Sequence, residues 1–253
     1  MTELSIHDLQ PQLTANRRYW TGWSGAEPDT DLPIYRTDIA HPLLNGVLRV
    51  RGRRLDEAIA EARRRLDGSV WAWWVGIDSD EGTAAGLLAR GFQQIAAMPI
   101  MAIDVRPADV PEVTGPPGLA IHELVRPETL TDYVTTYAGP LGIDPGQVAR
   151  VVECERDFSY PKVVRLAGSL DGKIVGTCTL SLGTEVAALY CIATDPEHRR
   201  SGIATALTLA ALRLAREAGR TVVTLQASAA GQPVYQRIGF ETVGGYALYA
   251  LPA

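Results

Sequence analysis

In the second half of the chain, apolar residues recur with strand and helix periods in turn. The run Val186–Ala193 is unbroken and predicts a buried strand. A polar loop follows, and then a helical stripe of apolar residues that predicts a helix over 202–218, ended by Gly219. Asp171-Gly172 is typical of a hairpin turn between two flanking strands. The other elements predicted here are strands at 119–125, 163–169, 173–182, 221–227, 241–243 and 246–251, and helices at 128–138, 145–158 and 229–237.

The first half repeats this order of elements after an irregular start. Asp29, Pro33 and Pro42 interrupt any long element near the N-terminus. The segment Leu88–Phe92 resembles Gln236–Phe240, and each follows a strand and a short helix. Strands are predicted at 46–50, 70–75, 92–97 and 100–105, and helices at 55–66 and 82–90. The repeated order predicts an α/β fold with two related domains, each a twisted mixed sheet flanked by helices.

A proline-rich stretch separates the two halves. Four of the thirteen residues in Arg106–Gly118 are proline, and no strand or helix period persists there. We therefore predict domains over 1–108 and 119–253, joined by a linker over 109–118.

Composition narrows the class of protein. Apolar residues make up 46% of the chain, which excludes intrinsic disorder, and the net charge of −5 disfavours a nucleic-acid binder. No apolar run approaches the roughly 20 residues of a membrane helix, and the first ten residues lack the pattern of a secretory signal. The 3 cysteines are not spaced as metal ligands. These features favour a cytoplasmic protein without a metal and without a membrane partner.

The segment Ile192–Thr205 carries the clearest chemical signal. A strand leads into a loop of basic and small residues, and the loop opens the long helix. A helix N-terminus offers unpaired N–H groups and the positive end of the helix dipole, so it can bind an anion. The small side chains of Gly202 and Ala204 leave the backbone accessible, while the flanking loop adds arginine and hydroxyl side chains. A plain helix start with Ser201 as the N-cap is the alternative.

Two motifs together resemble a known family. Arg199-x-x-Gly202-x-Ala204 follows the strand, and Tyr235-x-x-x-Gly239-Phe240 comes some thirty residues later. The first resembles the pyrophosphate loop of the GNAT superfamily of acyl-CoA-dependent N-acyltransferases, and the second resembles its Tyr-x-x-x-Gly-Phe segment. The resemblance covers 119–253, and the first half looks like a degenerate copy, as in tandem GNAT proteins.

This resemblance implies a co-substrate, acetyl-CoA or another acyl-CoA, and a place for it. The pantetheine arm would bond to the backbone of a strand that splays from 221–227. Ser228 would lie near the arm. The implied pantetheine residues are Cys191, Ile192 and Ala193, and the implied pyrophosphate residues are Arg199, Arg200, Ser201, Gly202, Ile203, Ala204 and Thr205.

The resemblance also implies catalytic roles. Tyr235 matches the general acid that protonates the departing thiolate, although a half-buried aromatic residue is the structural alternative. Glu185 stands where the family often carries its base, acting directly or through water, and it can equally be a solvated turn residue. The N–H near Ile192 is a candidate oxyanion donor. Cys191 invites a covalent mechanism, but no His or Asn is an obvious partner, so a buried small side chain is favoured.

The first half lacks the same signals. Gly202 precedes Gly239 by 37 residues, and counting 37 back from Gly91 gives Arg54 where a glycine is expected. Leu87 occupies the position that corresponds to Tyr235. We therefore expect no second phosphate loop and no second acid.

The sequence favours an N-acyltransferase that moves an acetyl group from acetyl-CoA to a small-molecule amine in a ternary complex. The alternatives are a non-catalytic acyl-CoA sensor and a transferase with another donor, a longer acyl-CoA or an aminoacyl-tRNA. Whether the protein is a monomer or a homodimer stays open. Residues of the region expected to contact the acceptor are Tyr133, Tyr137, Asp157 and Tyr160.

Overall fold

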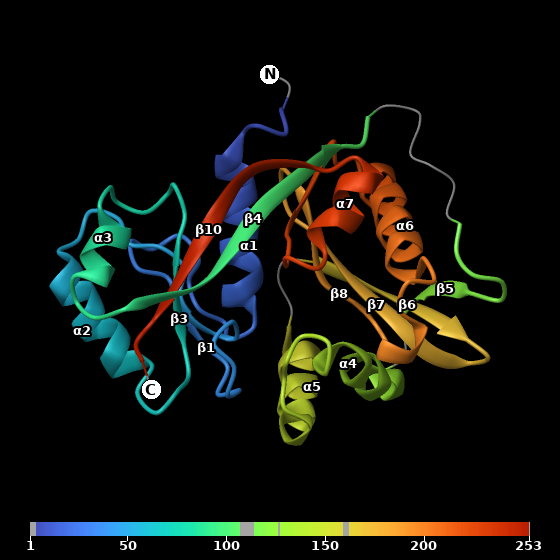
Figure 1. The fold of residues 1–253 in the computed structure, drawn as a ribbon, viewed down its shortest axis with the longest axis horizontal. Coiled ribbons are helices and arrows are strands. Elements are labelled where there is room, and N and C mark those ends of the chain that lie inside the picture. The colour runs from blue at the N-terminus through green and yellow to red at the C-terminus, as the bar shows by residue number, and fades with distance from the viewer. Residues whose placement is uncertain (1–3, 107–113, 126, 159–161, 253) are drawn as a thin grey trace.

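The strands of the chain form a single mixed sheet. The computed structural model describes residues 4–106, 114–125, 127–158 and 162–252. Within these residues the ten strands follow the order β1-β2-β3-β10-β4-β9-β8-β7-β6-β5. Figure 1 shows two lobes on either side of β4 and β10, which run across the middle of the molecule.

Most predicted elements are confirmed. The first lobe contains α1 (Leu9–Gly22), β1 (Ile34–Arg36), β2 (Asn45–Val47), α2 (Leu55–Arg65), β3 (Ala72–Val75), α3 (Thr83–Leu88) and β4 (Gln93–Asp104). The second contains β5 (Ala120–Glu123), α4 (Leu130–Ala138), α5 (Val148–Asp157), β6 (Lys162–Leu170), β7 (Lys173–Leu182), β8 (Ala187–Thr194), α6 (Ile203–Glu217), β9 (Val222–Gln226), α7 (Gln232–Ile238) and β10 (Glu241–Ala250). Short 3₁₀ turns lie at Pro127–Thr129, Pro145–Gln147 and Pro196–His198. Of the helices described, none combines the length and apolar character needed to cross a membrane.

The two lobes exchange their closing strands. β10 follows the second lobe in sequence, yet it pairs antiparallel with β3 on one side and β4 on the other. β4 in turn pairs antiparallel with β9. The sequence predicted two short strands where β4 lies and two where β10 lies. This prediction was wrong, because β4 and β10 are each continuous. A register shift between Thr242 and Gly244 lets β10 bend without breaking.

Helix α1 was not predicted, because polar residues interrupt the apolar face that it buries. Gln12, Asn16, Arg17 and Thr21 are all buried on it. Gln12 accepts a hydrogen bond of 2.8 Å from the Thr224 hydroxyl on β9. A search for apolar periodicity cannot detect a helix that buries amide and guanidinium groups.

The lobes share a buried hydrophobic cluster. Tyr19 of α1 and Trp23, which directly follows this helix, belong to the same cluster as Tyr137 on α4 and Tyr190 on β8. The predicted linker, 109–118, has residues 109–113 outside the described part of the chain, and its last five residues lead toward β5. The domain boundaries therefore stay a prediction, whereas the packing between the lobes is observed.

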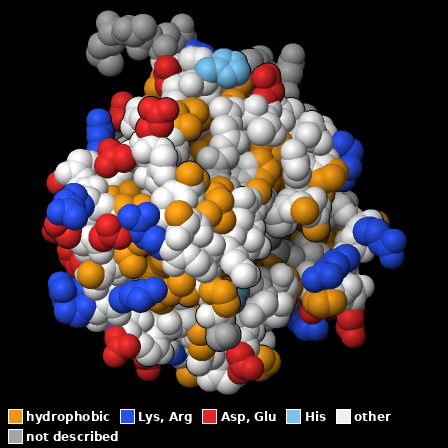
Figure 2. Space-filling model, turned by 60° about the vertical axis from the view of Figure 1, so that its left-hand side comes forward, with side chains coloured by type: hydrophobic (Ala, Val, Ile, Leu, Met, Phe, Trp, Pro, Cys, Tyr) orange, Lys and Arg blue, Asp and Glu red, His pale blue; other side chains and the backbone are white. Residues whose placement is uncertain are grey.

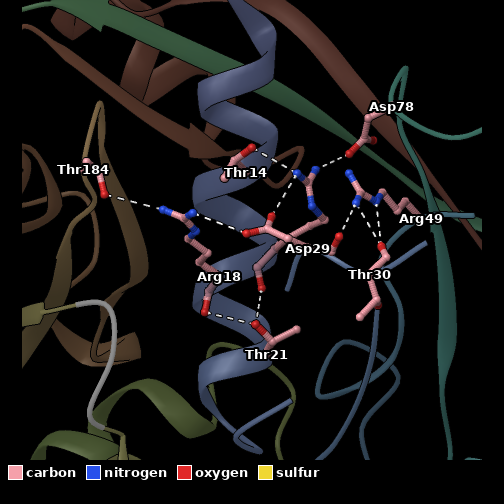
Figure 3. Close-up of polar contacts among 9 residues, drawn as sticks. Thr14, Arg18, Thr21, Asp29, Thr30, Arg49, Asp78 and Thr184 are labelled. Carbon is pink, nitrogen blue, oxygen red and sulfur yellow. Dashed lines mark hydrogen bonds and ion pairs between the residues drawn. The ribbon is translucent and has the colours of Figure 1, made fainter. Parts of the chain in front are cut away.

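A buried ion pair holds α1 to the first lobe. Arg17 donates to Asp78, and their side chains are 4% and 0% exposed. Burial raises the pKa of Asp78 and lowers that of Arg17, because removal from water disfavours both ions. Asp29 lies 3.9 Å from the same guanidinium but is 57% exposed. Figure 3 shows this region, with Arg49 bonded to Thr30 and Arg18 reaching Thr184 of the second lobe.

We predict that Asp78→Ala lowers the free energy of unfolding by about 3–5 kcal/mol, because it leaves a buried guanidinium without its counter-ion. Asp29→Ala removes an exposed partner of the same arginine and should cost less than about 1 kcal/mol. Urea unfolding of both variants measures the difference. Equal losses of unfolding free energy in the two variants would show that burial does not determine the contribution of the Arg17–Asp78 pair to stability.

Candidate functional site

A groove lies where β8, the start of α6 and α7 meet. Its volume is about 770 Å³, within the range of small-molecule sites. Most of the predicted site residues line it, together with Pro140 from the loop after α4. The predicted residues that line it are Ile192, Ala193, Arg199, Arg200, Gly202, Ile203, Ala204, Thr205, Ser228 and Tyr235.

The first turn of α6 presents unpaired backbone donors to this groove. Gly202 is the N-cap, with a φ of +87° and no side-chain capping bond. The first bond that closes the helix runs from the Ala206 N–H to the Gly202 carbonyl, at 2.9 Å. The N–H groups of 203–205 therefore have no partner within the helix. No atom of the described residues lies within 4 Å of the place where a Cβ of residue 202 would stand, so the backbone is open to a ligand.

Strands β8 and β9 separate beside these donors. They pair in parallel only over Ala187–Leu189 and Val223–Leu225. Past this point, the Ala227 N–H donates to the Pro99 carbonyl on β4, at 3.0 Å, so the chain after β9 turns away from β8. The splay that the family resemblance implied is confirmed.

The free part of β8 carries a β-bulge. Thr177 pairs with Ala193 and Thr179 with Tyr190, so Cys191 and Ile192 face the single residue between them on β7. Cys191 has a φ of +48°, in the left-handed region. A bulge leaves backbone groups outside the ladder, which makes this part of β8 available for hydrogen bonds to a ligand.

Tyr235 is held rigidly at the edge of the groove. Its ring is 8% exposed and packs edge-on against Phe240, with centroids 5.8 Å apart. A Cβ at Gly231 would lie 2.9 Å from the ring, so the glycine permits this close approach. The hydroxyl makes no hydrogen bond to the part of the chain described here. Burial raises the pKa of Tyr235 above its ordinary value, which keeps the phenol protonated at neutral pH.

Three of the predicted residues do not line the groove. Glu185 is exposed and borders a different hollow with Arg18 and Thr184. At about 3.3 Å per residue of strand, Glu185 is roughly 20 Å from Ile192. The Ser201 hydroxyl donates to the His198 carbonyl. The third residue, Cys191, points the opposite way, into the core between the lobes.

The cysteines are poor nucleophiles in this structure. Burial raises the pKa of the Cys191 thiol to about 12, and its polar neighbour is the Tyr19 hydroxyl, 3.6 Å away. Burial also raises the pKa of Cys154 and of Cys178. A covalent mechanism needs a thiolate, so the geometry does not support one. Across the described residues, no three His, Cys, Asp or Glu side chains group as a metal site.

The residues expected to contact an acceptor are buried elsewhere or exposed away from the groove. The Tyr133 hydroxyl lies 3.0 Å from that of Thr179, and the Tyr137 hydroxyl donates to Glu155 at 2.8 Å. Asp157 is exposed at the end of α5, and Tyr160 lies outside the described residues. The sequence missed Tyr19 and Pro99, which reach the site region from the first lobe through tertiary contacts alone.

The corresponding loop of the first lobe is occupied by the protein itself. Arg54 is the N-cap of α2, with a φ of −65°, and two acidic residues fill the first turn. The Gly52 N–H donates to the Asp80 carboxylate at 2.7 Å. Leu87, the counterpart of Tyr235, is fully buried. Carboxylates of the chain thus place negative charge beside the positive helix end, which disfavours an anionic ligand there.

The fold and the groove define an α/β protein with a site suited to a phosphorylated ligand. Comparison with known proteins gives its family: residues 128–240 match the model of the Acetyltransferase (GNAT) family. This part of the chain therefore belongs to the GNAT superfamily, and the protein is an acyltransferase.

Individual relatives agree with this assignment. The chain is similar to the mycothiol acetyltransferase of Pseudarthrobacter chlorophenolicus, with 25% identity over 83% of this chain and 71% of that one. Its fold is similar to a GCN5-related N-acetyltransferase from Kribbella flavida, with a TM-score of 0.66, 17% identity and coverage of 98% and 95%. It is also similar to a tandem GNAT protein from the clavulanic acid biosynthesis pathway, with a TM-score of 0.61, 21% identity and coverage of 81% and 74%.

We predict that the native protein has no fast-reacting thiol at pH 8. At a pKa of about 12, only on the order of one Cys191 in 10⁴ is a thiolate at that pH. Titration with a chromogenic disulfide should show slow labelling, and all 3 cysteines should react after denaturation in guanidinium. One equivalent labelled within seconds in the folded protein would reopen the covalent mechanism.

Proposed function

We propose that this protein transfers an acetyl group from acetyl-CoA to a small-molecule amine by direct attack within a ternary complex. One observation carries the proposal: unpaired N–H groups at the start of α6 and the protonated Tyr235 line the same groove. The name of the Pseudarthrobacter relative, an acetyltransferase, supports acetyl as the transferred group.

The groove fits the parts of acyl-CoA in order. A diphosphate suits the N–H groups of 203–205, with Arg199 and Arg200 adding positive charge. A pantetheine arm suits the part of β8 at the bulge, where backbone groups lie outside the ladder. Ser228 lines the same groove and would lie near the arm. Ser201 would contribute its backbone, because its hydroxyl is already bonded to His198.

The residues of the chain then divide the work of acyl transfer. Acyl-CoA supplies an activated thioester; a bond forms between the amine nitrogen and the acyl carbon, and the carbon–sulfur bond breaks. We assign the N–H of Ile192 at the bulge to polarise the acyl oxygen. We assign Tyr235 to donate its proton to the departing sulfur. Because Glu185 borders another hollow, we propose that the amine proton leaves through water rather than directly to this carboxylate.

We further propose one active site in the chain, in the region 119–253, with 1–108 as a degenerate copy. The carboxylates around Gly52 and the buried Leu87 support this division. The 3 cysteines are all free, which agrees with a cytoplasmic setting. On the face in Figure 2, basic and acidic side chains are interspersed, which does not favour a tRNA donor.

Tyr235→Phe should lower kcat about 10²-fold while the Kd for acetyl-CoA stays within about twofold, because the variant loses the proton and keeps the ring. The assay measures thiol release from acetyl-CoA with a panel of small amines. Tyr249→Phe is the control, since this buried tyrosine packs in the first lobe, away from the groove. Wild-type turnover in Tyr235→Phe would remove the acid from the mechanism.

The same panel separates the alternatives. Turnover with an amine supports the transferase. Tight coenzyme A binding without turnover for any amine would favour a sensor, and turnover only with a longer acyl-CoA would correct the donor.

Gly202→Glu should weaken coenzyme A binding at least about tenfold, because it places a carboxylate beside the donors that the diphosphate needs. Gly219→Glu is a matched control. Gly219 also has positive φ, +75°, and open space around a Cβ, but it follows the other end of α6. Isothermal titration with coenzyme A compares them. Equal affinities in both variants would refute the placement of the diphosphate.

A further inference from the structure

Tyr19 brings the first lobe into direct contact with the bulge of β8. Its ring stacks on that of Tyr190, with centroids 3.5 Å apart and planes within 1°. Its hydroxyl lies 3.6 Å from the Cys191 sulfur, across 172 positions of sequence. Tyr19 is 1% exposed, and Trp20, Trp23 and Phe158 surround its ring. The residue is therefore fixed in place while it touches two successive residues of β8.

The bulge is a strained conformation that needs such support. Cys191 adopts a φ of +48°, which residues with a side chain rarely occupy unless their surroundings hold them there. On the side of β7, the Thr177 hydroxyl donates to the Cys191 carbonyl at 2.7 Å. From helix α1, Tyr19 covers Tyr190 and the Cys191 thiol. The two contacts together hold the turn of the backbone from Tyr190 to Ile192.

The backbone of this bulge is also where acyl transfer would occur. The side chain of Ile192 lines the groove, whereas the Cys191 thiol points to the core between the lobes. Rotation about the backbone of Cys191 would turn the next N–H, that of Ile192, away from the acyl oxygen. A misplacement of about 1 Å in such a donor can cost about 10²-fold in rate.

We propose that Tyr19 is a positioning residue for this enzyme: it holds the bulge at Cys191, and so the N–H of Ile192, from the opposite lobe. The first lobe is then a required part of the active site, although the start of its own helix α2 carries acidic side chains in place of a phosphate loop. This inference rests on the proposed acyl transfer at the groove.

Two substitutions at Tyr19 distinguish the contribution of its ring from that of its hydroxyl. Tyr19→Leu removes the stacking on Tyr190 and should lower kcat at least about tenfold, with the KM and Kd for acetyl-CoA within about twofold, because the start of α6 is unchanged. Tyr19→Phe keeps the ring and should recover most of this loss, to within about fivefold of wild type, since the thiol is a weak hydrogen-bonding group.

Leu13→Ala is the matched control. Leu13 is fully buried on the same helix but belongs to the cluster that contains Tyr35 and Trp74. It should destabilise the protein, measured by urea unfolding, without changing kcat more than about twofold. If Tyr19→Leu and Leu13→Ala lower kcat equally at equal stability, Tyr19 has only a structural role and the proposal fails.

Amide hydrogen exchange tests the bulge without relying on turnover. Exchange in peptides that cover 190–194 should become faster in Tyr19→Leu than in wild type, and stay unchanged in Tyr19→Phe and Leu13→Ala. Unchanged exchange in Tyr19→Leu would overturn the positioning role even if the enzyme is active. Wild-type protein without turnover for any amine would instead count against the proposed function, and faster exchange in Tyr19→Leu would still support the contact that holds the bulge.

Discussion

The exchange of the last strand is the constraint on which the rest of the structure depends. β10 leaves the lobe that precedes it and inserts between β3 and β4. The hydrogen bonds that close the first lobe are thus supplied by the C-terminal end of the chain, and those on the free side of β9 by β4. Neither half can complete its sheet alone in this arrangement. The sheet is continuous, and α1 lies against both halves of it (Figure 1).

This constraint also shapes the groove. β4 pairs with β9 from Val222 to Gln226, and its Pro99 carbonyl then binds the Ala227 N–H. Those bonds draw the end of β9 toward β4, so among the described residues no strand pairs with β8 on that side beyond Leu189. The wedge between the strands is therefore set by a strand from the first half of the sequence. The groove is lined by residues of the second lobe, but its shape depends on β4, which comes from the first lobe.

The two lobes differ in what satisfies the positive end of their helices. At α6, the N-cap is a left-handed glycine and the first turn contains no acidic residue, so no carboxylate of that turn competes for the donors. At α2, two acidic residues in the first turn and the nearby Asp80 carboxylate, which accepts from the Gly52 N–H, place negative charge beside the helix start. Similar elements in a similar order thus have opposite uses. Local electrostatics, rather than the fold, decides which helix end is open to an anion.

The sequence alone predicted the helix α6, the loop from Arg199 to Thr205 and Tyr235 as a site residue, and the structure places all three at one groove. Each of these predictions depends on the spacing of residues close together in the chain. The α1 helix escaped this reasoning since it buries Gln12 and Arg17, whose partners on β9 and in the turn after β3 are distant in sequence. The spacing of residues in the sequence also did not decide whether Glu185 and Tyr235 share a site. In the structure they lie at different hollows, because the length of β8 separates them. Tertiary structure alone decided that β10 crosses to the first lobe and that Tyr19 meets Cys191, because packing and strand pairing depend on which surfaces meet in space rather than on local periodicity.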